Sequence, residues 1–141
     1  MESILEKSLV ESLIPQKAPF VMVDKLLFFA ENNIIAGLTI PESNIFVEEG
    51  RFVESGIVEH MAQSVALYTG YQFYLLNEPA PTGYIGSIKD VEVLELPKAG
   101  DELVTEVKVI QEFMGITLVD IITKCNDVQI ASAQMKTVLA K

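Results

Sequence analysis

The sequence predicts an α+β fold in which an antiparallel β-sheet wraps around one long central helix. From Ile57 to about Leu76 the chain contains no proline and is apolar on nearly every face, a pattern that is typical of a fully buried helix. The rest of the chain reads as roughly six strands, two before this helix and the others after it. One helix beside so many strands favours a sheet that curves around it.

The first half of the chain is expected to contain a short helix within residues 2–11, followed by a β-hairpin. The hairpin strands are predicted at Phe20 to Ala30 and Ile34 to Ile40, and Asn32-Asn33 forms the turn because asparagine tolerates a positive φ. An irregular, acidic segment follows. Ser55 is then expected to cap the central helix by accepting an amide hydrogen bond.

The second half is expected to be a run of long antiparallel strands. Apolar side chains alternate with polar ones along the second of these strands, as a half-buried strand requires. Asn126-Asp127 is a good hairpin turn, and the segment 98–101 supplies another. The predicted strands are Tyr84–Leu96, Glu102–Phe113, Gly115–Cys125 and Val128–Leu139. This arrangement is the hotdog fold, and we expect it to occupy residues 1–141 as one domain, with sheet edges that pair in a dimer.

Composition excludes several classes of function. A formal net charge of -10 argues against nucleic acid and anionic membrane surfaces as partners, because both attract basic residues. Cys125 is the only cysteine, and nothing resembles a Cys/His zinc cluster, so neither a metal nor another cofactor is expected. With no signal peptide and no apolar stretch long enough to span a bilayer, the sequence predicts a cytoplasmic protein.

The most informative stretch runs from Ser55 to Gln63 and places the carboxylate of Glu59 inside the apolar helix. Burying an ionised carboxylate without partners is strongly unfavourable. Glu59 is therefore either part of a satisfied structural network or an acid required in a dry pocket. His60, the only histidine, is its neighbour but lies about 100° around the helix, and a structural role for this imidazole competes with a catalytic one.

Several motifs together resemble the 3-hydroxyacyl-(acyl-carrier-protein) dehydratases. The segment from Leu13 to Asp24 is similar to the opening of that family, and Glu59 to Gln63 resembles its helix motif Glu-Ala-x-Ala-Gln. Gly86 to Lys89 and Pro97 to Leu103 resemble its Gly-x-x-x-Lys and Pro-x-x-Pro-Gly-Asp-x-Leu segments. The resemblance covers nearly the whole chain, in the right order, and implies the hotdog fold.

The chain departs from that family where the family carries its catalytic histidine, in a Gly-His-Phe-Pro loop. Arg51 stands at this place if Gly50 and Phe52 are matched, and Ile45 stands there without a gap. Neither can act as a base, since arginine stays protonated at ordinary pH. Gln16 replaces the histidine of the opening motif. The branch resembles divergent dehydratase-like proteins of bacterial polyene and resorcinol-type pigment pathways.

The resemblance implies a role for each candidate site residue. Glu59 would be the acid that helps to expel water, with Gln63 orienting it and His60 as the one available imidazole. Backbone amides near Gly56 and Ile57 would polarise the thioester carbonyl. Two further substrate-binding candidates are Arg51, which is alternatively a plain surface residue, and Gly86.

Three functions remain open from the sequence. The first is a dehydratase acting on 3-hydroxyacyl thioesters, linked to acyl carrier protein or coenzyme A, in fatty-acid or polyene-type synthesis. The second is a hotdog acyl thioesterase in which Glu59 activates water. The third is a non-catalytic acyl-binding protein, or the heterodimer partner of an active dehydratase, which the missing histidine favours. We expect a homodimer, with a heterodimer with an active dehydratase as the alternative.

Overall fold

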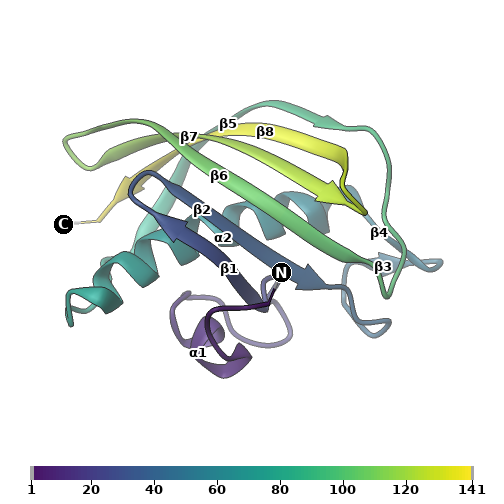
Figure 1. The fold of residues 1–141 in the computed structure, drawn as a ribbon. Coiled ribbons are helices and arrows are strands. Elements are labelled where there is room, and N and C mark those ends of the chain that lie inside the picture. The colour runs from purple at the N-terminus through teal and green to yellow at the C-terminus, as the bar shows by residue number, and fades with distance from the viewer. Residues whose placement is uncertain (1, 141) are drawn as a thin grey trace.

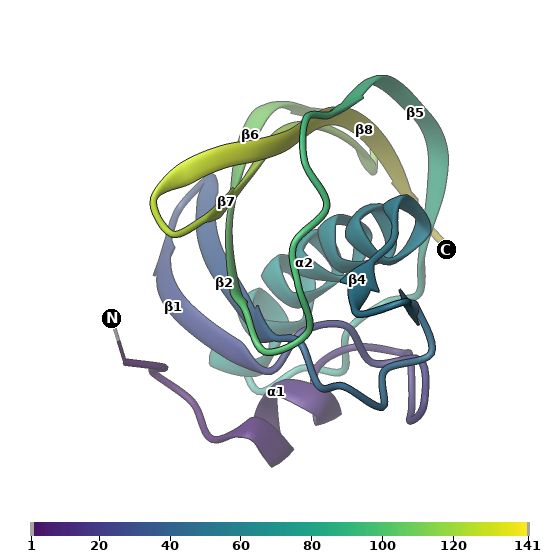
Figure 2. The ribbon, with the colours of Figure 1, turned by 90° about the vertical axis from the view of Figure 1, so that its right-hand side faces the viewer.

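The computed structural model describes residues 2–140, and within them a six-stranded antiparallel sheet curves around one long helix, α2 (Figure 1). The strand order across the sheet is β1-β2-β6-β7-β8-β5, and α2 lies on the concave side, as the end-on view in Figure 2 shows. The predicted hotdog arrangement is therefore confirmed. The elements are α1 Lys7–Ser12, β1 Lys25–Ala30, β2 Asn33–Thr39, β3 Val47–Glu48, β4 Arg51–Phe52, α2 Glu54–Leu75, β5 Gly83–Val93, β6 Glu102–Phe113, β7 Ile116–Cys125 and β8 Val128–Leu139.

Strands β6, β7 and β8 form where the sequence predicts them, because side-chain alternation and turn chemistry agree. Thr105 of β6 lies opposite Thr123 of β7, and both side chains are buried on the concave face. The turn between β7 and β8 is at Asn126 and Asp127, whose φ angles are 53° and 63°. A two-residue turn with positive φ at both positions matches the right-handed twist of the strands that it joins.

Helix α2 begins three residues earlier than the apolar pattern predicts. Its N-cap is Val53, whose amide donates to the carbonyl of Phe46 at 2.9 Å, so the chain enters the helix directly from the β3–β4 ladder. The predicted cap at Ser55 is therefore wrong, since Ser55 lies exposed within the first turn. The helix ends at Leu75, and Asn77 follows with a φ of 55°.

The N-terminal segment differs most from the prediction. The short helix is confined to α1, and strand β1 starts at Lys25, so residues 20–24 form a loop beside α2. The apolar run through this loop suggests a strand, but the backbone groups of Met22 bond to side chains of α2. Its N–H donates to Gln63 Oε1 at 2.6 Å, and its carbonyl lies 2.6 Å from His60 Nδ1. These bonds replace the strand ladder that the pattern predicts.

Strand β5 forms one edge of the sheet and pairs with β8 along one side only. Five large apolar side chains in and just after β5 are between 40% and 61% exposed: Tyr84, Ile85, Ile88, Val91 and Leu94. An exposed apolar edge strand offers unpaired backbone groups to another chain. Among residues 2–140, no helix is both long enough and apolar enough to cross a membrane.

Candidate active site

The side chains of Glu59 and Gln63 meet one turn apart on α2. Gln63 Nε2 donates to Glu59 Oε2 at 2.7 Å, as the i,i+4 spacing predicts. Gln63 is fully buried and also donates to the carbonyl of Phe20 at 2.8 Å. Because its Oε1 accepts from the amide of Met22, the orientation of the Gln63 amide is determined by three partners.

Glu59 is half-buried rather than sealed in the dry pocket that the sequence suggests. Among residues 2–140, none of the ion pairs involves its carboxylate. Its hydrogen-bond partner is the neutral amide of Gln63, so the carboxylate is oriented without being locked to a cation. A carboxyl group held in this way can exchange a proton with a bound molecule.

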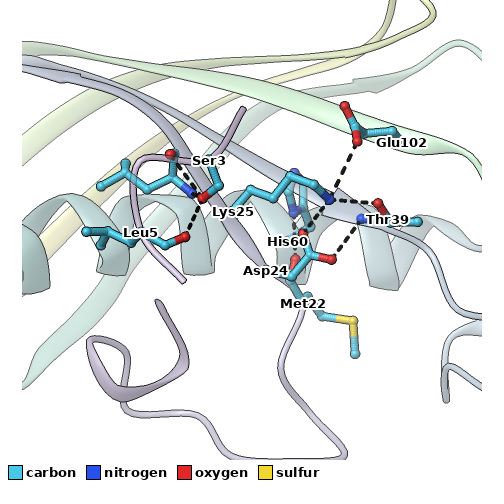
Figure 3. A network of polar contacts seen from close by, with 9 residues as sticks. Ser3, Leu5, Met22, Asp24, Lys25, Thr39, His60 and Glu102 are labelled. Atoms are coloured by element: carbon cyan, nitrogen blue, oxygen red, sulfur yellow. Dashed lines mark hydrogen bonds and ion pairs between the residues drawn. The ribbon is translucent and has the colours of Figure 1, made fainter. Parts of the chain in front are cut away.

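His60 is directed away from Glu59 into the core. Its Nδ1 lies 2.6 Å from the carbonyl of Met22 (Figure 3). The ring is fully buried, and its Nε2 lies 2.8 Å from Thr105 Oγ1. Since a carbonyl only accepts, Nδ1 carries the proton, and Nε2 accepts from the Thr105 hydroxyl. Thr105 Oγ1 in turn lies 2.7 Å from Thr123 Oγ1.

Burial lowers the pKa of His60 from 6.5 to about 4, against the opposing effects of the Met22 carbonyl and the nearby charge of Asp24. The imidazole is therefore neutral near pH 7, and both of its nitrogens are occupied. This arrangement matches the structural role that the sequence left open for His60.

The backbone amides expected to polarise a thioester carbonyl are already bonded within the first turn of α2. The amides of Gly56 and Ile57 both donate to the carbonyl of Val53, at 2.9 and 3.2 Å. A Cβ at Gly56 would lie 2.7 Å from the side chains of Phe46 and Phe52, so close packing explains this glycine. Their role as donors to a substrate stays a prediction.

The other two substrate-binding candidates lie on separate strands. Arg51 of β4 is exposed and donates from Nη1 to the carbonyl of Leu96 at 3.0 Å. Gly86 of β5 lies at a register shift between Ile85 and Ser87, where a Cβ would make ordinary contacts of 3.4 and 3.5 Å. Binding of substrate by either residue stays a prediction.

A cavity of about 320 Å³ begins one turn beyond Glu59 along the same stripe of α2. Ala62 and Ala66 form part of its wall, at spacings of three and seven residues from Glu59. The remaining walls come from residues 12–16, from the segment leading into β5, and from the end of β8. No local pattern in the sequence indicates this cavity, because its walls come from segments far apart in the chain.

The described part of the chain, residues 2–140, contains no group of three or more histidine, cysteine, aspartate or glutamate side chains that could hold a metal ion. Cys125 is buried, and burial raises its pKa to about 11, with the charges of Asp101 and Glu95 adding to the shift. A thiol with so high a pKa is a poor nucleophile near neutral pH.

Comparison with protein families gives a match over residues 8–141 to the ApeP-like family, which is described as ApeP dehydratase. The chain belongs to the ApeP-like dehydratase family. The chain is also similar to the 3-hydroxyacyl-(acyl-carrier-protein) dehydratase FabZ of Vibrio cholerae, with 29% identity over 137 residues that cover 90% of this chain and 86% of that protein. The predicted resemblance to a dehydratase family is thus confirmed, and the chain is dehydratase-like.

Solved structures support the fold of this ApeP-like chain. The dehydratase heterocomplex ApeI:P from Xenorhabdus doucetiae contains a chain that matches with a TM-score of 0.86 and 15% identity, covering 94% of this chain and 91% of that one. Cj0977, a sigma28-regulated virulence protein from Campylobacter jejuni, matches with a TM-score of 0.73 and 12% identity, covering 99% and 93%. At these identities the likeness concerns the fold.

Proposed function

We propose that this chain supplies the acid, Glu59, to a 3-hydroxyacyl-thioester dehydratase site whose base comes from a partner chain. Dehydration requires a base that removes the proton beside the thioester carbonyl and an acid that protonates the departing hydroxyl. The electron pair of the broken C–H bond forms the double bond, and the protonated hydroxyl leaves as water. If Glu59 is the acid, the site therefore needs a second titratable group as its base.

The observation that carries this proposal is the separation of Glu59 from the only imidazole of the chain. Glu59 is half-buried, is oriented by Gln63, and lies one helical turn before Ala62, the first residue of α2 in the cavity wall. His60 is neutral, and both of its ring nitrogens are hydrogen-bonded in the core. Arg51 cannot accept a proton at ordinary pH. The chain belongs to a dehydratase family but has no suitable base of its own. A base supplied by another chain would explain this difference.

The exposed edge of β5 supports the partner in this proposal. Its side chains Ile88, Val91 and Leu94 are large, apolar and 40% to 61% exposed, and its outer backbone groups can extend a ladder into a second sheet. The name of the ApeI:P heterocomplex describes two different chains in one dehydratase. By analogy, we favour a heterodimer over the homodimer for this chain.

The cavity is suited to receive the acyl chain of the substrate. Its wall on α2 runs from Ala62 to Gly70, and Thr69 lies ten residues, or about 15 Å, from Glu59 along the helix axis. A chain that enters beside Glu59 can therefore extend along the small side chains of this stripe. The thioester carrier, acyl carrier protein or coenzyme A, would remain outside the cavity.

The experiment measures enoyl thioester formation from 3-hydroxyacyl thioesters of several chain lengths, with this chain alone and as a complex with the dehydratase-like protein that co-purifies from its host. The complex should be active and the chain alone should not. Glu59→Gln should reduce the rate of the complex by about 10²- to 10⁴-fold. Equal rates for wild type and Glu59→Gln would refute the proposal, and release of free thiol from acyl thioesters would favour a thioesterase instead.

A further inference from the structure

The two backbone polar groups of Met22 are held by two side chains of α2 that are three residues apart. Gln63 Oε1 accepts from the N–H of Met22 at 2.6 Å, and His60 Nδ1 donates to its carbonyl, also at 2.6 Å. Met22, His60 and Gln63 are each 0% exposed, so water cannot replace either contact without opening the core. We call this pair of contacts the Met22 clamp.

The clamp determines which way the Gln63 amide faces. The N–H of Met22 is a donor, so it requires the oxygen of Gln63, and the amide nitrogen must then face the other way. That nitrogen lies 2.8 Å from the carbonyl of Phe20 and 2.7 Å from Glu59 Oε2. Loss of the Met22 contact would leave the amide held only through its nitrogen, by the Phe20 carbonyl and Glu59, and would loosen the position of the Glu59 carboxylate.

His60 connects this clamp to the sheet. On the side opposite Met22, its Nε2 accepts from Thr105 of β6, which is bonded to Thr123 of β7. Figure 3 shows His60 of α2 beside Met22, in the segment that leads into β1. Because Met22 precedes β1 in a loop, the bond from His60 is the contact that fixes its carbonyl to the helix.

We propose that His60 is a positioning residue for Glu59: through the carbonyl of Met22 it holds the loop that orients Gln63, and Gln63 orients the carboxylate. This inference rests on the proposed role of Glu59 as the acid, and it assigns to the only histidine a function other than proton transfer. A displacement of about 1 Å at a reacting group costs up to 10²-fold in rate, so the effect of losing the clamp is measurable.

Three variants of His60 distinguish the effect of the Nδ1 contact from that of the Nε2 contact. His60→Asn places an amide N–H near the position of Nδ1 and keeps the donor to Met22. His60→Gln reaches toward Thr105 instead, and His60→Phe keeps the ring shape without a donor. Thr105→Val is the matched control, because it removes the partner of Nε2 and touches neither Met22 nor Glu59.

Two measurements follow. In the complex with the partner, His60→Gln and His60→Phe should lower kcat by about 10- to 100-fold with little change in KM. His60→Asn and Thr105→Val should keep kcat within about threefold of wild type, since both leave the Met22 contact in place. In the chain alone, hydrogen exchange at the Met22 amide should stay slow in wild type, His60→Asn and Thr105→Val, and should become fast in His60→Gln and His60→Phe.

Unchanged kcat and unchanged Met22 exchange in folded His60→Phe would overturn the inference, and so would an equal loss of kcat in Thr105→Val. If Glu59→Gln left the rate of the complex unchanged, the proposed function would fail on its own. The exchange rate at Met22 would then still decide whether His60 holds the loop that orients Gln63.

Discussion

The pKa of His60 predicts how the stability of this protein depends on pH. The pKa is 6.5 in the unfolded reference and about 4 in the folded protein, a difference of roughly 2.5 units. The unfolded chain therefore binds a proton that the folded chain does not bind between these values. At about 1.4 kcal/mol per unit, the free energy of unfolding should fall by up to about 3 kcal/mol as the pH drops from above 6.5 to about 4.

Two measurements check this prediction. Because the chain has a single histidine, the imidazole signals in an NMR titration belong to His60 without ambiguity. Urea unfolding at several pH values, in wild type and in His60→Asn, separates the contribution of the histidine from that of the carboxylates, and only wild type should show the extra loss. An imidazole that titrates near pH 6.5 in the folded protein would contradict this prediction, because it would mean that the ring is solvated.

Three further predictions concern packing, assembly and the cavity. Gly70→Ala would place a Cβ in a steric clash with the carbonyl of Leu13, so it should destabilise the protein by about 1–3 kcal/mol in urea unfolding. Gly86→Ala, whose Cβ would lie 3.4 Å from its nearest neighbour, should change stability little. Ile88→Lys on the exposed edge of β5 should abolish association in analytical ultracentrifugation and leave the circular dichroism spectrum unchanged. Ala66→Phe would fill part of the cavity and should reduce turnover of long acyl chains at least tenfold relative to short ones, as measured by kcat/KM.

The parts of the fold that the sequence predicts correctly are those in which local pattern and tertiary packing agree. Helix α2, the strands β6 to β8 and the turn at Asn126 and Asp127 follow from apolar periodicity and turn chemistry alone. The pairing of Glu59 with Gln63 is similarly local, because four residues on a helix lie one turn apart. The observed bounds of α2 and of β6 to β8 differ from the predicted ones by a few residues at most.

The parts that could not be predicted depend on contacts between distant segments. The sequence of residues 20–24 predicts a strand. These residues form a loop instead, because the side chains of His60 and Gln63, about forty residues away, hydrogen-bond to the backbone of Met22. The buried threonine beside His60 comes from β6, a further forty-five residues along the chain. No periodicity in the sequence encodes these contacts, so the sequence favours a structural role for His60 over a catalytic one but does not identify its partners.

In the function proposed above, this chain supplies the acid of a dehydration site and takes its base from another chain. Its most direct test is the rate of enoyl thioester formation under single-turnover conditions, for the chain alone, for the complex with its partner, and for the complex that carries Glu59→Gln. We expect activity in the wild-type complex, none above background in the chain alone, and a loss of about 10²- to 10⁴-fold in the variant complex. Full activity in the chain alone, or an unaffected variant complex, would contradict the proposed function.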